Sequence, residues 1–173
     1  MFFSVFGGAW LLLAFYAFGW LHILTGCLIA AAIVLFVIAA IRIQRRGNDA
    51  AKDAYPKEEL RRNGRLFGIN NAVMWIGIFL VFQITSRLEY PDLAPAIVAL
   101  LVGLHFFAMP PLYRHRANLV TGAVLTAWAI LCLLLFHGDR LIGLVAAGAG
   151  LALWTSAAWA LTAARQMLRS AGL

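Results

Sequence analysis

The residue best placed for chemistry is His105, a titratable side chain inside a long apolar run. Polar groups are costly in an apolar environment, so those that occur there are the first candidates for function. Six further polar side chains occupy comparable places in other apolar runs: Asn70, Asn71, Thr121, Thr126, Thr155 and Ser156. If these runs are helices of one bundle, their polar faces predict a ligand pocket or pathway with His105 at its floor.

A purely structural interpretation of the same residues is also open. Ser and Thr side chains in helices often hydrogen-bond to a carbonyl group of their own helix. A His beside an Asn of a neighbouring helix can form a hydrogen bond that contributes only about 0.6–2 kcal/mol. Sequence alone therefore leaves two roles for His105, ligand binding and helix packing.

A double proline, Pro110-Pro111, begins five residues after His105. Proline removes a backbone donor and clashes with the preceding turn, so a helix should kink or end there. A kink would free carbonyl groups close to His105, as in many membrane binding sites. An ending would only terminate the helix, and this simpler outcome is the one we expect.

The sequence contains no recognisable set of residues for catalysis or metal binding. There is no HExxH, GxSxG or phosphate-loop motif, and no second acid–base residue accompanies His105. Cys27 and Cys132 lie in apolar runs outside any CxxC pair. His22 and His137 fall in or beside turns, where bis-His haem ligation is disfavoured. We therefore predict no enzyme activity, no metal and no cofactor.

The composition points to a membrane protein. Of the 173 residues, 64% are apolar and only 12% are charged, against roughly a quarter charged in soluble domains. A soluble domain of this size cannot bury so much hydrocarbon, because its surface is too large relative to its volume. A lipid bilayer is the expected solvent, which excludes a soluble enzyme, a disordered regulator and a disulfide scaffold.

The apolar runs have the lengths of membrane spans, about 20 residues each. Residues 1–41 carry no charged side chain, which is enough for two spans joined by a turn near Gly19–His22. Four more runs follow. We predict one all-α transmembrane domain, a polytopic bundle of six helices in three hairpins, with spans at about 2–20, 23–41, 66–86, 93–113, 117–136 and 141–164.

One hydrophilic stretch, residues 42–65, separates the second and third spans and contains eight of the fourteen Lys and Arg residues. Within it, Pro56, early acids and late bases predict a short surface helix that ends at Asn63-Gly64. We expect a solvated cytoplasmic loop, with a docking site for a partner protein as the alternative.

Lys and Arg are distributed unevenly along the chain. Residues 42–65, the link after the fourth span and the tail hold twelve, whereas the links after the third and fifth spans hold two. Cytoplasmic segments of membrane proteins carry the basic excess, so both termini should face the cytoplasm of a bacterial inner membrane. The net charge of +7 then reports orientation and not nucleic-acid binding; recognition of anionic lipid headgroups is the alternative.

The sixth predicted span has small residues at spacings of three and four, namely Gly143, Ala147, Gly148 and Gly150. Such faces let helix backbones approach closely in a membrane, where hydrophobicity gives helices no drive to associate. Packing inside the chain is the expected role of this face. An interface between copies of the chain is the alternative.

The run from Gly103 to Tyr113, Gly-Leu-His-Phe-Phe-Ala-Met-Pro-Pro-Leu-Tyr, has an apolar span on either side. It resembles small six-span bacterial inner-membrane proteins of unassigned function. The resemblance covers approximately the third to sixth spans and implies the six-span architecture. It brings no catalytic or binding residues with it.

Two functions stay open from the sequence. The first is a small multi-pass membrane protein that binds or passes a neutral or lipidic small molecule through a polar pocket facing the cytoplasm. The alternative is a non-catalytic accessory or assembly subunit. Its packing faces and basic loop would then hold a membrane partner protein or further copies of the chain.

Overall fold

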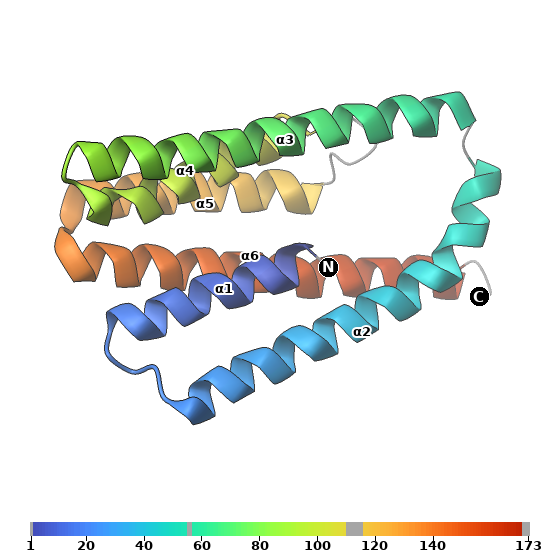
Figure 1. The fold of residues 1–173 in the computed structure, drawn as a ribbon. Helices are drawn as coiled ribbons and strands as arrows, with labels where there is room; N and C mark the ends of the chain where they lie inside the picture. The colour runs from blue at the N-terminus through green and yellow to red at the C-terminus, as the bar shows by residue number, and fades with distance from the viewer. Residues whose placement is uncertain (1, 55–56, 110–115, 171–173) are drawn as a thin grey trace.

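The described part of the chain forms a bundle of six α-helices (Figure 1). The computed structural model describes residues 2–54, 57–109 and 116–170, with side chains described at 3–43, 57–109 and 116–166. The helices are α1 (Phe2–Ala17), α2 (Ile23–Ala54), α3 (Lys57–Arg87), α4 (Ala94–Phe107), α5 (Arg116–Leu135) and α6 (Gly138–Ser170), and a 3-10 helix, η1 (Pro91–Leu93), precedes α4. These residues include no strand, so the predicted all-α class is confirmed.

Four of the helices, α2, α3, α5 and α6, are long and apolar enough to cross a bilayer. The other two are apolar but shorter, with 16 residues in α1 and 14 in α4. At 1.5 Å per residue these correspond to about 24 and 21 Å. Many large apolar side chains of α2 and α3 are exposed, including Leu24, Leu35, Val73 and Phe79. Exposed apolar helices of this length indicate a membrane protein.

The short turns of the chain lie together at one end of the bundle. Figure 1 shows the α1–α2, α3–α4 and α5–α6 connections at the left, and the start of α1 and the end of α6 lie away from that end. The first turn is at Gly19–His22, as predicted, and Gly19 has a φ of 68°, which glycine adopts without steric cost. The backbone N–H of Gly138 donates to Asp92 Oδ2 over 3.3 Å, which ties the second turn to the third.

The most extensive helix contacts join α1 to α6 and α4 to α5, and neither pair is consecutive within a hairpin. A pair of glycines lies at each of these two crossings. A Cβ on Gly150 would stand 3.0 Å from the carbonyl oxygen of Gly7, and one on Gly122 would stand 2.8 Å from that of Gly103. Each backbone therefore approaches the other more closely than any larger residue permits.

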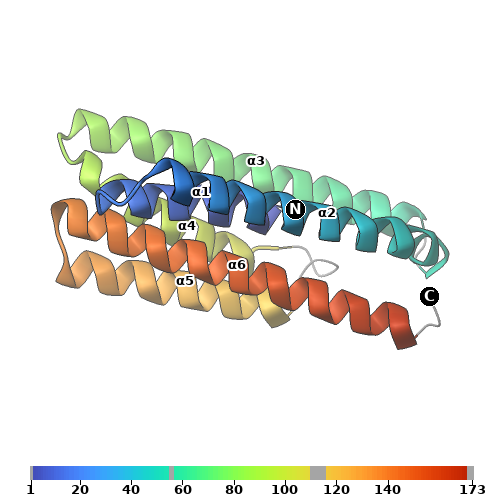
Figure 2. The same cartoon turned by 90° about the horizontal axis from the view of Figure 1, so that it is seen from below.

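The predicted loop at residues 42–65 is mostly helical, which corrects the sequence interpretation. Helix α2 continues to Ala54, α3 begins at Lys57, and both extend beyond the ends of α1 and α5 (Figure 2). The predicted stop at Asn63-Gly64 is also wrong. Asn63 Nδ2 donates to the carbonyl of Glu59 over 3.0 Å, and a helical Gly costs only about 1 kcal/mol relative to Ala, too little to end a helix that continues through an apolar span.

The fourth predicted span is shorter than expected. Helix α4 ends at Phe107, where the N–H of Ala108 closes the last turn on the carbonyl of His105 over 3.1 Å. The helix thus ends before the double proline, which agrees with the simpler of the two predicted outcomes. Pro56 and residues 110–113, on which other parts of the prediction rest, lie outside the described residues.

Candidate ligand site

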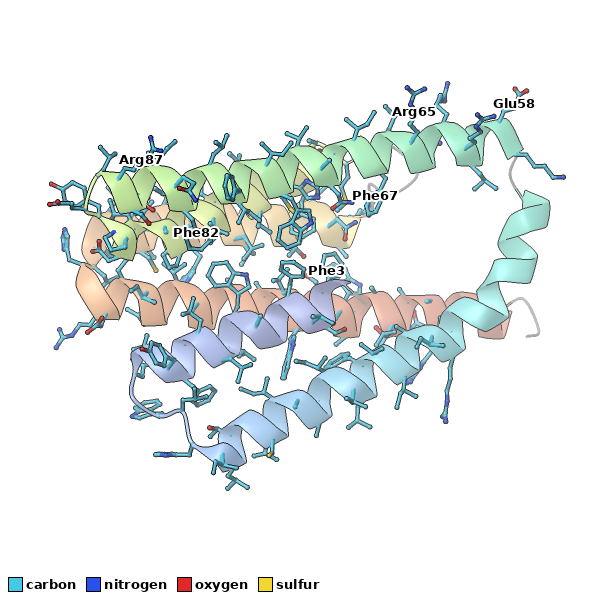
Figure 3. All side chains as sticks on the ribbon, in the orientation of Figure 1. Phe3, Glu58, Arg65, Phe67, Phe82 and Arg87 are labelled. Carbon is cyan, nitrogen blue, oxygen red and sulfur yellow. The ribbon has the colours of Figure 1, made fainter. Side chains whose placement is uncertain are left out.

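The central residue of the candidate site, His105, lies near the end of α4 and is 6% exposed. Its Nε2 atom has no hydrogen-bond partner among the described residues. The next residue, Phe106, is fully buried, and its ring lies 5.4 Å from that of Phe3 at the start of α1, measured between centroids. Figure 3 shows Phe3 between α1 and the helices opposite it. His105 therefore lies in the interior, close to where α1 begins.

Helix α3 brings a second polar side chain close to the level of His105. Leu101 of α4 packs on Gly77 of α3, since a Cβ at Gly77 would stand 2.7 Å from Leu101 Cδ2. The two helices are antiparallel (Figure 1), so His105 lies about level with Met74, and Asn70 lies one turn further along. Asn70 Nδ2 is buried and has no partner within the described part of the chain.

Helix α5 contributes the third polar group, Thr126. Its Oγ1 atom is buried and finds no hydrogen-bond partner in the described segments. It lies against the backbone of α4, because a Cβ on Gly103 would stand 2.5 Å from it. Gly103 precedes His105 by two residues, and residues two apart on a helix point about 200° apart, so Thr126 lies on the side of α4 opposite to His105. Asn70 and His105 share the α3 side of α4, because they follow the helical period of Gly77 and Leu101, which are in contact.

Thr121 and Ser156, two of the predicted site residues, instead pair with each other. Thr121 Oγ1 donates to the carbonyl of Ala117 over 2.7 Å, and Ser156 Oγ hydrogen-bonds Thr121 Oγ1, which joins α5 to α6. Both side chains are buried. Because their hydrogen-bonding groups are used within the chain, this pair is a structural contact.

The remaining two predicted residues lie outside the site or are already partnered. Asn71 Nδ2 donates to the carbonyl of Phe67 over 3.1 Å, so its amide returns to its own helix. Thr155 is exposed, and its hydroxyl donates to the carbonyl of Leu151 over 2.8 Å. Adjacent polar residues thus have different roles, because neighbours on a helix point 100° apart.

Two other polar residues in the same half of the bundle did not enter the sequence prediction. Ser4 is 2% exposed, and its carbonyl accepts the Nε1–H of Trp154 over 3.0 Å. Asn118 Nδ2 contacts Met109 Sδ at 3.5 Å. The spacing of three between Asn118 and Thr121 was the available signal, because it places both on one face of a helix.

The small residues of α6 face other helices of the same chain. A Cβ on Gly143 would stand 2.6 Å from the ring of Phe18, and one on Gly150 would stand 2.6 Å from Leu11 Cγ. Gly148 lies against Trp128, whose Nε1–H donates to the carbonyl of Leu144 over 2.9 Å. Ala147 packs against the core. This face is occupied within the chain.

The candidate metal and redox residues do not converge. Cys27 is exposed, Cys132 is buried, and both are free thiols. His22 and His137 are exposed side chains at the turns. Across the described residues, no group of three or more His, Cys, Asp or Glu side chains is arranged to hold a metal ion.

The hydrogen bond between Thr121 and Ser156 gives a first test of the arrangement. Thr121→Val keeps the shape of the side chain but leaves Ser156 without its partner, so we expect the free energy of unfolding to fall by about 0.6–2 kcal/mol. The measurement is unfolding by SDS in mixed detergent micelles. Thr155→Val is the matched control, because its hydroxyl is exposed and bonds only within α6. Equal stability of both variants would contradict the α5–α6 pairing.

The comparisons with known proteins give one match. A family model described as a family of unknown function (DUF7010) matches residues 55–163, more than half of the chain. Neither a curated protein nor a solved structure matches. The matched range includes most of α3 to α6, and with them Asn70, His105 and Thr126, whereas α1 and α2 precede it.

Proposed function

Because the chain belongs to the DUF7010 family, a family of unknown function, we propose a function from its own buried polar groups. We propose that the protein is a small multi-pass membrane protein that binds, or passes, a neutral or lipidic small molecule along α4, at Asn70 and His105 on its α3 side and at Thr126 on its α5 side. The observation that carries the proposal is the three buried polar atoms without a partner among the described residues.

The free energy needed to bury these atoms without a hydrogen bond supports the binding of a ligand here. A buried donor or acceptor that forms no hydrogen bond costs about 1–3 kcal/mol, and the hydrocarbon of a bilayer supplies no water to satisfy it. Asn70 and His105, on the same side of α4, match a molecule that brings its own polar groups, and Thr126 is a further unsatisfied group on the other side of that helix. Asn70 Nδ2 donates, and both Thr126 Oγ1 and His105 Nε2 can donate or accept. A molecule with carbonyl or hydroxyl oxygens fits this set.

The absence of buried charge favours a neutral ligand. Among the described residues, the buried polar side chains are Ser4, Asn63, Thr85, His105, Thr121 and Ser156, with no Asp, Glu, Lys or Arg. A charged ligand would lack a counter-charge in a site that is expensive for ions. A catalytic role is equally unsupported, because the described side chains include no second buried acid or base beside His105. The proposal therefore contains no chemical step.

The membrane placement we propose uses all six helices. Helices α1 and α4 are short, but α1 packs along α6 and α4 packs along α5. Because α5 and α6 are long enough to span a bilayer, we place α1 and α4 in the same apolar layer. The turns lie at one end, and eleven of the fourteen basic residues belong to described helices whose basic ends point toward the other. We place that basic end in the cytoplasm of a bacterial inner membrane, as for the small six-span proteins that the chain resembles.

The accessory-subunit alternative has less support. Its predicted packing face consists of Gly143, Ala147, Gly148 and Gly150. The three glycines lie against Phe18, Trp128 and Leu11 of the same chain, and Ala147 packs against the core. A partner helix would have to displace α1 and α5 to reach them. The basic segments at the cytoplasmic end are the remaining feature that a partner protein would use.

The proposal predicts that water reaches position 105 from the cytoplasmic side. We expect His105→Cys, in a background with Cys27→Ala and Cys132→Ala, to be modified by a small charged thiosulfonate reagent in inside-out vesicles. Val102→Cys is the matched control, since Val102 lies on the same helix and is 3% exposed. It should remain unmodified.

Two results would overturn this site. One is a folded His105→Cys variant that stays unmodified, which would show that the side chain is sealed between helices. The other is equal modification of the variants at positions 105 and 102, which would show general solvent access. Modification of the His105→Cys variant only in right-side-out vesicles would reverse the proposed orientation.

A further inference from the structure

The exposed face of α3 carries a row of residues that the ligand site does not use. Arg61, Arg65, Gly68 and Ala72 are all exposed, and their spacings of four, three and four place them within about 60° around the helix at 100° per residue. Figure 3 shows Arg65 on the side of α3 that points away from the bundle. The row therefore faces the surroundings of the protein.

The charges at the head of this row have no acidic partner among the residues whose side chains are described. Arg61, Arg62 and Arg65 form no ion pair within the described segments, although Glu58 lies within reach of Arg61 and Arg62 by helical spacing. Glu58 projects from the same side of α3, near its start (Figure 3). It lies seven residues before Arg65, or about 10 Å further along the axis, so the positive charge at Arg65 is not neutralised there.

The height of the arginines on α3 matches the headgroup layer of a bilayer. Exposed large apolar side chains on this helix run from Leu66 to Ile84. Eighteen steps of 1.5 Å make this band about 27 Å long, close to the hydrocarbon thickness of about 30 Å. Arg65 directly precedes the band and Arg61 lies one turn beyond it, where the phosphates of lipids reside.

The small residues provide room for a lipid chain below those charges. No atom lies within 4 Å of a Cβ built on Gly64 or Gly68, and Ala72 continues the row into the apolar band. An acyl chain that lies along Gly68 and Ala72 can contact the backbone closely while its phosphate reaches the arginines. Guanidinium groups bind phosphate oxygens well, because their donors match them in pairs.

We infer that Arg61 and Arg65 bind the phosphate of an anionic phospholipid whose acyl chain lies along Gly68 and Ala72. The occupant is a lipid of the cytoplasmic leaflet, chosen by charge complementarity and by the position of the row at the edge of the apolar band. This inference rests on the membrane placement proposed above and is independent of the site around His105.

The test is native mass spectrometry of the full chain in detergent, titrated with phosphatidylglycerol or with phosphatidylcholine of the same acyl chains. We expect the wild type to bind phosphatidylglycerol more tightly. The double variant Arg61→Gln, Arg65→Gln should lose affinity for it by about 10- to 30-fold, as expected for two basic contacts. Gly68→Leu, which has open space around it, should weaken binding without changing the charge.

The matched control is the double variant Arg87→Gln, Arg140→Gln. It removes the same charge from the opposite end of the bundle and should bind phosphatidylglycerol like the wild type. Equal losses in the two double variants would overturn the inference in favour of a general charge effect. A wild type that binds both lipids equally would overturn the inference as well. The site around His105 would not be affected by that result, because modification of the His105→Cys variant tests it separately.

Discussion

Gly122→Ala is expected to lower the free energy of unfolding by about 1–3 kcal/mol, the usual range for a group forced into a packed core. Its Cβ would stand 2.8 Å from the carbonyl oxygen of Gly103 and 2.9 Å from the Cβ of Phe106. Neither atom can rotate away, because one belongs to the backbone of α4 and the other is fixed to it. Phe106 is completely buried, so α4 and α5 would have to separate.

Unfolding by SDS in mixed micelles measures this effect, and Gly68→Ala is the matched control. Gly68 is also in a helix, but no atom lies within 4 Å of its Cβ position, so Ala there should be neutral or stabilise the helix by up to about 1 kcal/mol. A Gly122→Ala variant as stable as Gly68→Ala would show that α4 and α5 do not cross at these glycines.

Replacing a buried polar residue whose hydrogen bonds are satisfied lowers the free energy of unfolding. For His105→Leu we expect no such loss. Nε2 has no partner among the described residues, so an apolar side chain of similar volume removes a desolvation cost of about 1–3 kcal/mol. We expect a free energy of unfolding equal to or higher than that of the wild type. A polar group kept in an apolar interior against stability is typical of a functional site.

The same SDS titration distinguishes this outcome from a packing role. Thr121→Val is the contrasting variant, because Thr121 is hydrogen-bonded to Ser156 across α5 and α6 and its replacement should destabilise the protein. A His105→Leu variant that is destabilised as much as Thr121→Val would mean that His105 makes a structural hydrogen bond. The ligand site would then lose its central residue.

The order of the helices and the end of α4 follow from local features of the sequence. Long apolar runs form helices wherever lipid is the solvent, because only internal hydrogen bonds satisfy their backbone groups. Gly19 marks the first turn, and α4 ends at Phe107, shortly before Pro110. Each of these signals acts within a few residues, so the sequence is sufficient to locate it.

Local signals were misleading where they were weak. Asn63-Gly64 predicted a helix end, but α3 continues through both residues, and Asn63 satisfies its own amide on Glu59. One glycine changes helix stability by only about 1 kcal/mol, less than the apolar segment that follows contributes. The hydrophilic composition of residues 42–65 predicts contact with water, but it does not determine whether the backbone is helical.

The roles of the polar residues were decided by tertiary structure alone. Asn70 and Asn71 are adjacent and chemically identical, yet Asn71 returns to Phe67 and Asn70 stays unpartnered among the described residues. Thr121 and Ser156 pair only because α5 and α6 bring positions 35 residues apart into contact. Composition and helical period determine which segments are long and apolar enough to enter the membrane. Which face of each helix meets which neighbour depends on the close backbone approach at Gly7–Gly150 and Gly103–Gly122. These pairs join residues that are far apart in the sequence, so no local pattern encodes them.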